Sequence, residues 1–355
     1  MKILHTEWME AKGGQASRVL DDLKIIKELG HTPFLACKSQ SWLYQNASEA
    51  GIAVFDVQYK NIFDIKSFFQ LLKIMKKHQI DIVHTHSSKD SYVATLAAKI
   101  SGLKIVRSRH MQLTKKPTML YYIADAIVTT GEKIREAFIG AGVEKEKIVS
   151  IPSYPDEDLY RPSEEIRTAL RKKYHIEKEI VIASMTGFNS QKRPRLLLPV
   201  IAKLVSEGYA VKLLLAGKEE KDEKKRFDEK VKALKIEEYV GYVGFVQAEV
   251  FLNVIDIYVC PSSSEGIPQA LMQAMMMGKA AVSTNVGSIC DLNREDTLRL
   301  VEKDDTKALG QWIETLVKEE TLRRELGQKN YDVMRKYFSR SVMKEKTKMV
   351  YENLK

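Results

Sequence analysis

Cysteine is scarce in this chain of 355 residues: only Cys37, Cys260 and Cys290 occur, and no two form a CxxC pair. This argues against a disulfide framework or a structural zinc site and favours a reducing, intracellular compartment. Long apolar runs are also lacking. No window of about 18 consecutive apolar residues occurs, so no transmembrane helix is expected. The short apolar start is interrupted by Glu7 and Glu10, which argues against a signal peptide.

Several short motifs are absent too. Neither GxGxxG nor GxxxxGK[ST] occurs, so the usual dinucleotide and P-loop fingerprints are missing. Apolar residues make up 44% and charged residues 29%, which excludes a disordered or low-complexity chain. At roughly 100–200 residues per domain, the length predicts two domains.

Positive charge is in excess and unevenly spread. Lys and Arg number 57 against 47 acids, a net charge of +10, and residues 57–120 hold twelve cations against Asp64, Asp81 and Asp90. Phe63 and Phe69 lie within this basic stretch. One interpretation is a solvated helix face. The other is a surface that meets anionic lipid head groups. No nucleic-acid-binding motif accompanies the charge, so no nucleic-acid partner is predicted.

Short β-branched runs alternate with amphipathic segments, which is typical of parallel strands joined by crossover helices. In the first part we expect strands at 2–5, 32–37, 81–84, 104–107 and 126–129, and helices at 18–29, 65–78 and 92–101. A proline-rich stretch at 151–163 is the predicted linker. Beyond it we expect strands at 180–184, 211–216, 240–245, 255–260 and 280–284, and helices at 196–208, 269–278, 306–318 and 323–337. The pattern predicts two α/β domains, at 1–160 and 161–337.

Ligands of open parallel sheets bind outside the carboxyl ends of the strands, and two such sheets make a cleft between the domains the expected site. After the first strand, Gly13 and Gly14 precede a helix, where backbone amides can approach an anion. A plain turn is the alternative. Asp156-Glu157-Asp158 has the spacing of a metal-binding motif, but it lies in the predicted linker and favours a solvated acidic turn.

Histidines and arginines follow two further strands of the first domain. His84 and His86 are two residues apart, so an extended strand points both to the same side. Two imidazoles alone make a poor metal site, and we expect one of them to reach a ligand. Arg107, Arg109 and His110 follow the next strand and could face an anionic acceptor. Alternation along the strand would let only part of this set reach the cleft.

Two loops of the second domain have the strongest chemical signals. Lys192 and Arg193 precede a helix and could neutralise a diphosphate, a basic surface turn being the alternative. Ser262-Ser263-Ser264-Glu265-Gly266 links a strand to a helix, presenting free amides and one carboxylate. The methionines at 272, 275, 276 and 277 indicate a buried helix rather than a cofactor site.

With this segment the sequence resembles the retaining glycosyltransferases of the two-Rossmann-domain (GT-B) fold, most of all the family 4 group that uses nucleotide-diphosphate sugars. The matching features are the serine-rich turn with Glu265-Gly266-Ile267-Pro268, the segment 278–284, the pair Gly13-Gly14, the sequence His84-Thr85-His86 and the basic loop 187–193. The likeness covers essentially the whole chain. It implies a C-terminal helix, at about 338–355, that crosses back to the first domain.

The resemblance implies transfer of a sugar with retention at the anomeric carbon, without a metal ion or other cofactor. It assigns His86, Lys192 and Glu265 to catalysis. Donor contacts are assigned to Gly13, Gly14, Gly187, Asn189, Arg193, Ser264, Gly266, Ile267, Pro268 and Gln273. Acceptor contacts are assigned to Arg107, Arg109 and His110. The partners are a nucleotide sugar and a glycan or glycolipid acceptor of the bacterial surface type, such as lipopolysaccharide or capsule. We expect a cytoplasmic protein that meets the anionic inner face of the plasma membrane through residues 57–120.

The chain departs from the family pattern at one important position. The second glutamate of the motif, which binds the ribose hydroxyls, is replaced by Gln273, and an amide bonds them with roughly half the strength of a carboxylate. An alternative hypothesis is therefore a sugar-nucleotide-binding protein with impaired catalysis. A third is another two-domain α/β enzyme, such as an epimerase or an NAD-linked oxidoreductase, although the missing GxGxxG argues against the latter.

Overall fold

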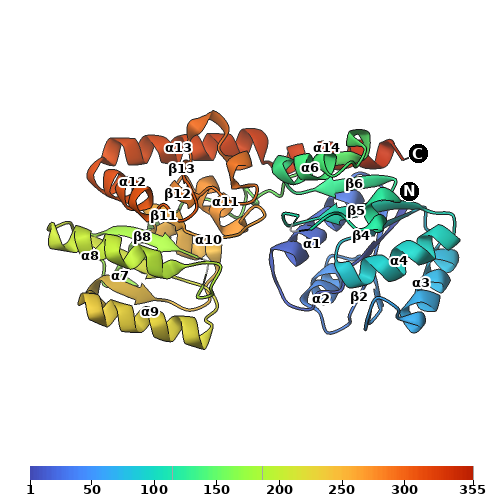
Figure 1. Ribbon diagram of the computed structural model, residues 1–355, viewed down its shortest axis with the longest axis horizontal. Coiled ribbons are helices and arrows are strands. Elements are labelled where there is room, and N and C mark those ends of the chain that lie inside the picture. Colours follow the sequence, from blue (N-terminus) through green and yellow to red (C-terminus); the bar gives the residue numbers. More distant parts are fainter. Residues whose placement is uncertain (114, 186, 355) are drawn as a thin grey trace. The chain divides into compact units, whose positions relative to one another are not determined.

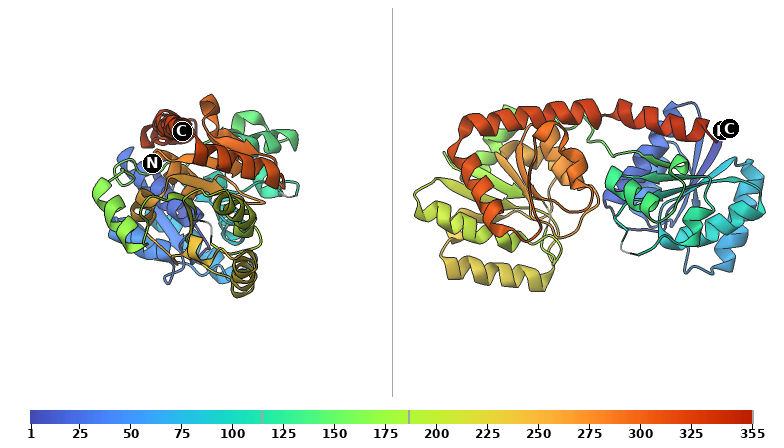
Figure 2. Two further views of the ribbon diagram at one scale, coloured as in Figure 1. Left: turned by 90° about the vertical axis from the view of Figure 1, so that its left-hand side faces the viewer. Right: turned by 45° about the horizontal axis from the view of Figure 1, so that its top comes forward.

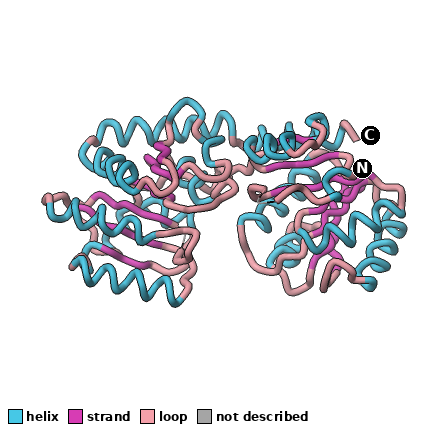
Figure 3. Tube along the Cα trace, viewed as in Figure 1, coloured by secondary structure: helices cyan, strands magenta, loops and turns pink. Residues whose placement is uncertain are grey.

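The computed structural model describes residues 1–113, 115–185 and 187–354, and its chain forms two compact units (Figures 1 and 3). Unit 1 is Met1–Ser153 together with Ser341–Lys355, and unit 2 is Tyr154–Arg340. The sequence predicted boundaries at 160 and 337. The last residue of the predicted C-terminal segment, Lys355, lies outside the described residues.

Unit 1 contains a seven-stranded parallel sheet in the order β3-β2-β1-β4-β5-β6-β7. Its strands are β1 (Lys2–Thr6), β2 (Thr32–Cys37), β3 (Ala53–Asp56), β4 (Ile82–Thr85), β5 (Lys104–Arg109), β6 (Ala126–Thr129) and β7 (Ile148–Ser150). Its helices are α1 (Gly14–Glu28), α2 (Trp42–Glu49), α3 (Ile65–His78), α4 (Ser88–Ile100), α5 (Met119–Tyr122), α6 (Glu132–Gly140) and α14 (Arg340–Glu352).

Alternation along the strands of unit 1 decides which helices cover which face. Leu4, Val83 and Ile105 point to one face, where they pack with buried side chains of α3 and α4. Their strand neighbours His5 and His84 point to the other face, because successive side chains alternate. There Tyr351 of α14 contacts both histidines, so the last helix covers the central strands of this unit (Figure 2).

Unit 2 contains a six-stranded parallel sheet in the order β10-β9-β8-β11-β12-β13. Its strands are β8 (Ile180–Ser184), β9 (Val211–Leu215), β10 (Val240–Tyr242), β11 (Ile257–Cys260), β12 (Ala280–Thr284) and β13 (Arg299–Val301). Its helices are α7 (Glu164–Lys173), α8 (Leu198–Ser206), α9 (Lys221–Leu234), α10 (Ala248–Phe251), α11 (Gln269–Met276), α12 (Thr306–Lys318) and α13 (Glu320–Tyr337).

The sheet of unit 2 is buried on both faces. Val181 and Ala183 pack with α11 and α13, whereas Ile182 between them packs with α8, α9 and α12. The four methionines of 272–277 are fully or almost fully buried in the first of these clusters, which confirms that they form core. Asp158 pairs with Arg161 in an exposed turn, as expected for the acidic segment.

The predicted elements are largely confirmed, and the errors have physical causes. The first helix begins at Gly14 rather than at Arg18, since glycine disfavours helix interiors and hides the start. Helix α9 was missed because charged residues dominate it and only a few apolar side chains, Phe227 and Val231 among them, are buried. Helices α2, α5, α6, α7 and α10 and strands β3, β7 and β13 were missed as well. Among the described helices, none combines the length and apolar character needed to cross a bilayer.

Candidate active site

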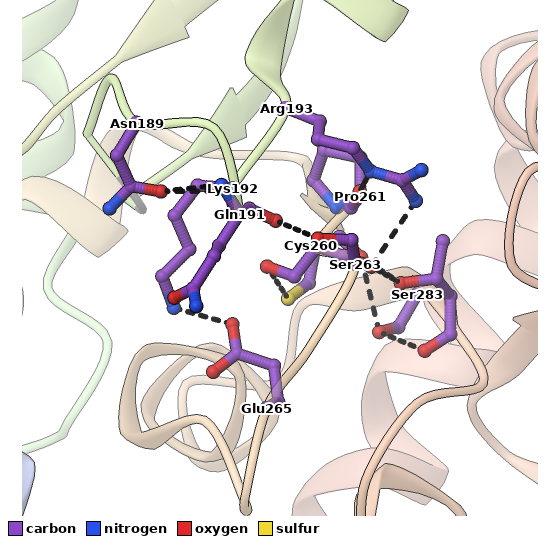
Figure 4. Close-up of polar contacts among 11 residues, drawn as sticks. Asn189, Gln191, Lys192, Arg193, Cys260, Pro261, Ser263, Glu265 and Ser283 are labelled. Carbon is purple, nitrogen blue, oxygen red and sulfur yellow. Dashed lines mark hydrogen bonds and ion pairs between the residues drawn. The ribbon is translucent and has the colours of Figure 1, made fainter.

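The strand order of unit 2 reverses between β8 and β11, and parallel sheets bind ligands at such a switch point. The loop after β8 contains Lys192, and the loop after β11 contains Glu265. Lys192 Nζ donates to Glu265 Oε1 at 2.5 Å, and the two side chains are 23% and 10% exposed (Figure 4). The structure therefore brings together two of the predicted catalytic residues, as an ion pair that remains partly accessible to a ligand.

The two loops are tied together by backbone and guanidinium contacts (Figure 4). The backbone N–H of Ser263 donates to the carbonyl of Gln191 at 2.7 Å. Arg193 Nε donates to the carbonyl of Pro261 at 3.0 Å, one terminal nitrogen reaches the carbonyl of Ser262, and the other pairs with Asp304. The Arg193 guanidinium thus braces the site, and its predicted contact with the donor stays a prediction.

Two glycines permit close backbone approaches in this site. Gly187 has φ +69°, and a Cβ there would lie 2.3 Å from the carbonyl oxygen of Lys218. Gly287 has φ +61°, and a Cβ there would lie 1.9 Å from the carbonyl oxygen of Glu265. Gly287 was not among the predicted site residues, although its place shortly after the strand at 280–284 was an available signal.

The remaining predicted donor residues differ in their environments. Asn189 Oδ1 accepts from the backbone N–H of Lys192 at 2.9 Å and so shapes the basic loop. Ser264 is exposed, Ile267 is half-buried and Pro268 is buried just before α11. The carbonyl of Gly266 accepts from the backbone N–H of Ser288 at 3.0 Å.

Gln273, the departure from the family pattern, lies half-buried on α11. Its side-chain amide has no hydrogen-bond partner among the residues that the structure describes, which leaves it available to a ligand. None of these donor assignments is tested by the structure, so they stay predictions.

In unit 1 the switch point lies between β1 and β4, and a buried polar network follows it. Glu7 accepts hydrogen bonds from Gln15 at 2.6 Å, from the backbone N–H of Met9 at 2.9 Å and from Ser87. Burial raises the pKa of this carboxyl despite these bonds. The network was not predicted, because its residues are scattered along the sequence.

The glycine pair borders this network. Gly13 caps α1 in an extended conformation, and a Cβ there would meet open space. The first amides of the 15-residue helix are thus free to meet an anion.

Histidines fill the core beside that network. His5 and His84 are register partners on β1 and β4, and His86 follows on the same side. Burial lowers the pKa of His5 to about 3 and lowers the pKa of His84 and of His86 well below the usual value. One ring nitrogen from each of the three lies within 4.8 Å of the others, a spacing that could hold a metal ion. Both ring nitrogens of each histidine are, however, engaged in hydrogen bonds within the protein.

The three residues predicted to contact the acceptor are split by the alternation of β5. Arg107 is buried, with its guanidinium 4.1 Å from the ring centre of Tyr121. Arg109 donates to the carbonyls of Met111 and Gln112. His110 is half-buried and lies 3.2 Å from a ring nitrogen of His86. Only His110 is thus joined to the histidine group, and the acceptor role of all three stays a prediction.

Comparison with protein families decides the class. The family model "Glycosyltransferase Family 4" matches residues 12–158, and "Glycosyl transferases group 1" matches residues 166–333. The chain belongs to these glycosyltransferases. The two models together span every strand of both sheets except β1.

Curated relatives point the same way. The capsular polysaccharide biosynthesis glycosyltransferase CapM of Staphylococcus aureus is 25% identical over 308 residues, covering 81% of this chain and 80% of CapM. An Escherichia coli relative, UDP-Gal:alpha-D-GlcNAc-diphosphoundecaprenol alpha-1,3-galactosyltransferase, is 25% identical over 330 residues, covering 86% and 85%. The first name describes an enzyme of capsular polysaccharide biosynthesis, and the second describes one that uses UDP-Gal.

Solved structures confirm the GT-B fold. HepE of Anabaena, crystallised with UDP, superposes with a TM-score of 0.90 at 17% identity, covering 99% of this chain and 100% of HepE. A glycosyltransferase of Rickettsia africae gives a TM-score of 0.89 at 20% identity, covering 99% and 98%.

Proposed function

We propose that this glycosyltransferase moves a sugar from a nucleotide-diphosphate donor to a lipid-linked or lipopolysaccharide- or capsule-type glycan acceptor, with retention and without a metal ion. The observation that supports this most is the Lys192–Glu265 ion pair at the switch point of unit 2. A cation and a carboxylate side by side match a ligand with a charged diphosphate and a sugar rich in hydroxyl groups.

In the proposed reaction the bond between the anomeric carbon and the diphosphate oxygen breaks, and the acceptor hydroxyl oxygen bonds the same face of that carbon. The acceptor proton passes to the departing phosphate. Lys192 neutralises the charge that develops on the diphosphate, which is the largest catalytic term in many enzymes. Glu265 accepts hydrogen bonds from the sugar hydroxyls. We keep for His86 the role of contacting the transferred sugar, for which its Nδ1 exchanges the 3.2 Å bond with His110 for one to the ligand. For the amides after Gly13 we keep the role of meeting an anion.

A UDP donor is the first choice. The Escherichia coli relative is named for UDP-Gal, and HepE was crystallised with UDP and with UDP-glucose. The free amide of Gln273 is suited to a neutral hydrogen bond with the ribose hydroxyls.

A binding panel tests this proposal. Wild type, Lys192→Ala and Glu265→Ala are titrated by calorimetry with UDP-, GDP-, ADP- and CMP-sugars in EDTA, with Lys203→Ala as the control. Lys203 also pairs with a glutamate of unit 2, but on its exposed surface. We expect one nucleotide class to bind wild type and the control and to bind both site variants weakly. Failure of folded wild type to bind any sugar nucleotide would contradict the proposal.

The surface of α3 and α4 supports a membrane-bound acceptor. These helices pack side by side, and with the loop before α3 they expose Phe63 by 82%, Ile65 by 70%, Phe69 by 63%, Leu96 by 56% and Ile100 by 64%. Exposed lysines surround these residues at 60, 66, 73, 76, 77 and 99. Exposed apolar side chains among lysines fit an anionic lipid surface, where each cation contributes about 1 kcal/mol.

Vesicle co-sedimentation tests that surface. Wild type should pellet with vesicles containing phosphatidylglycerol and should stay in solution with pure phosphatidylcholine. Phe63→Ser/Phe69→Ser should weaken binding to the anionic vesicles without changing donor affinity. Equal binding to both vesicle types would count against electrostatic docking.

A further inference from the structure

Five hydrogen bonds join one serine, four histidines and one tyrosine of unit 1 into a single line. Ser108 Oγ lies 2.8 Å from His84 Nε2, and His84 Nδ1 lies 2.7 Å from the Tyr351 hydroxyl. That hydroxyl lies 3.3 Å from His5 Nε2. His5 Nδ1 then lies 2.9 Å from His86 Nε2, and His86 Nδ1 lies 3.2 Å from His110 Nε2. We call this line the histidine chain; Ser108 and Tyr351 are buried, and His110 at the far end is half-buried.

The rings of the histidine chain are neutral near pH 7. Burial lowers the pKa of His5 and of His110 to about 3. Burial first, and then neighbouring positive charge such as Arg18, lowers the pKa of His84 and of His86 well below the ordinary value. A neutral imidazole has one N–H donor and one acceptor nitrogen, and a tyrosine hydroxyl has one proton to donate.

Proton counting then leaves two arrangements. If Tyr351 donates to His5, then His84 must donate to Tyr351, and every ring has its proton on Nδ1. If Tyr351 donates to His84, the direction reverses and every ring has its proton on Nε2. Any mixed arrangement places two lone pairs or two protons face to face, or leaves the Tyr351 hydroxyl proton without an acceptor. Each of these costs the free energy of an unmade hydrogen bond in a buried line.

We propose that Tyr351 of α14 is a positioning residue that joins His84 to the three directly bonded histidines, so that all four share one tautomer and the donating nitrogen of His86 changes only together with the other rings. The importance of His86 for turnover rests on the proposed function, whereas the shared tautomer does not. The last helix of the chain thus couples the hydrogen-bonding direction of His86 to that of His84.

The test is the ¹⁵N chemical shift of the histidine ring nitrogens in uniformly ¹⁵N-histidine-labelled protein near pH 7.5. The seven histidines are assigned by single substitution. We expect one tautomer for His5, His84, His86 and His110, and loss of that uniformity in Tyr351→Phe. Tyr59→Phe is the matched control, because Tyr59 is equally buried in unit 1 and its hydroxyl bonds the carbonyl of Ala36 instead.

Two results would overturn the proposal: mixed tautomers in wild type, or a pattern that Tyr351→Phe leaves unchanged. If Tyr351→Phe does not fold, Ser108→Ala removes the last partner of the line but no bond between the rings, so the four histidines should keep one shared tautomer. Mixed tautomers in that variant would also overturn the proposal. Stoichiometric zinc bound by the rings in purified protein would also overturn it, because the nitrogens would then be metal ligands.

Kinetic measurements distinguish a positioning role of Tyr351 from a purely structural one. Tyr351→Phe should lower kcat about ten-fold, the effect of one hydrogen bond, with KM for the donor unchanged. Tyr59→Phe should lower the melting temperature similarly with kcat intact. Uniform tautomers in a protein without transferase activity would refute the proposed function and leave the shared tautomer standing.

Discussion

The two units place their predicted catalytic residues at the same point of the fold, but these residues are charged in unit 2 and neutral in unit 1. Each has a parallel sheet whose strand order reverses once, and each places its predicted catalytic side chains at that reversal. Unit 2 fills the position with a partly exposed ion pair, Lys192 and Glu265. Unit 1 fills it with buried imidazoles that burial keeps neutral. The shared topology therefore determines where the predicted catalytic side chains lie. Their burial determines whether they can offer a ligand a charge or only a hydrogen bond.

The ion pair of unit 2 should give the largest effects. Lys192→Ala and Glu265→Gln should each lower kcat by about 10²–10³-fold, as for loss of one electrostatic contact to the transition state. Glu265→Gln should change stability little, whereas Lys192→Ala leaves the buried Glu265 carboxylate without its partner and should cost about 1–3 kcal/mol. Transfer rates and melting temperatures check this, and normal turnover in either variant would contradict the site.

Gly287, which lies against the backbone of Glu265, tests whether the close packing of that loop is needed for donor binding. Gly287→Ala should destabilise the protein by roughly 3 kcal/mol and weaken donor binding, because it adds a backbone clash to a positive φ. Gly208→Ala is the control, with φ +83° and open space, and should cost about 1–2 kcal/mol with binding unchanged. Urea unfolding and calorimetry give both numbers. Equal effects of the two would mean that the approach to Glu265 is not restrictive.

Acid should destabilise the protein through the buried, neutral histidines of unit 1. The pKa of His5 is about 3 in the folded chain and about 6.5 when unfolded, so between these values the unfolded chain holds more protons. The free energy of unfolding therefore falls as pH falls through this window. Each such histidine contributes up to about 1.4 kcal/mol per pH unit, and His5→Gln should remove that contribution from the slope.

Asp90 provides a second test of acid stability. Protonation of its buried carboxyl changes the free energy of unfolding in the opposite direction to protonation of the histidines. Burial raises its pKa well above the usual value, so the folded state takes up its proton first and gains stability as pH falls. Asp90→Asn should therefore make the acid-induced loss of stability steeper between pH 6 and 5. A shallower slope would contradict the raised pKa.

The smallest effect is expected at Gln273. Gln273→Glu should tighten nucleotide binding about five-fold, since a charged acceptor strengthens hydrogen bonds to the ribose hydroxyls. Calorimetry with the preferred donor in EDTA measures this. Weaker binding would place the ribose elsewhere, and turnover that appears only in Gln273→Glu would support the impaired-catalysis alternative for the natural chain.

The sequence predicted the fold well where apolar periodicity was strong. Ile65–His78 and Ala280–Thr284 were predicted to the residue, whereas the charged α9 was missed because few apolar side chains hold it. Lys192 and Glu265 are 73 residues apart in the sequence, but the loop of each follows a strand. Because ligands of parallel sheets bind at the carboxyl ends of the strands, the sequence could predict that these two loops lie at one site. The contact of Tyr351 with His84 spans 267 residues, and no local pattern signals it.

The discontinuity of unit 1 has a consequence for how the enzyme is made. Residues 341–352, which cover His5 and His84, are translated after the whole of unit 2. Until they emerge from the ribosome, the central strands of the nascent first unit lack their cover, and its polar core stays open to water. Unit 2 has no such dependence and can complete its own core first. We therefore expect a released chain that is truncated before residue 341 to hold a protease-resistant second unit together with a protease-sensitive first one.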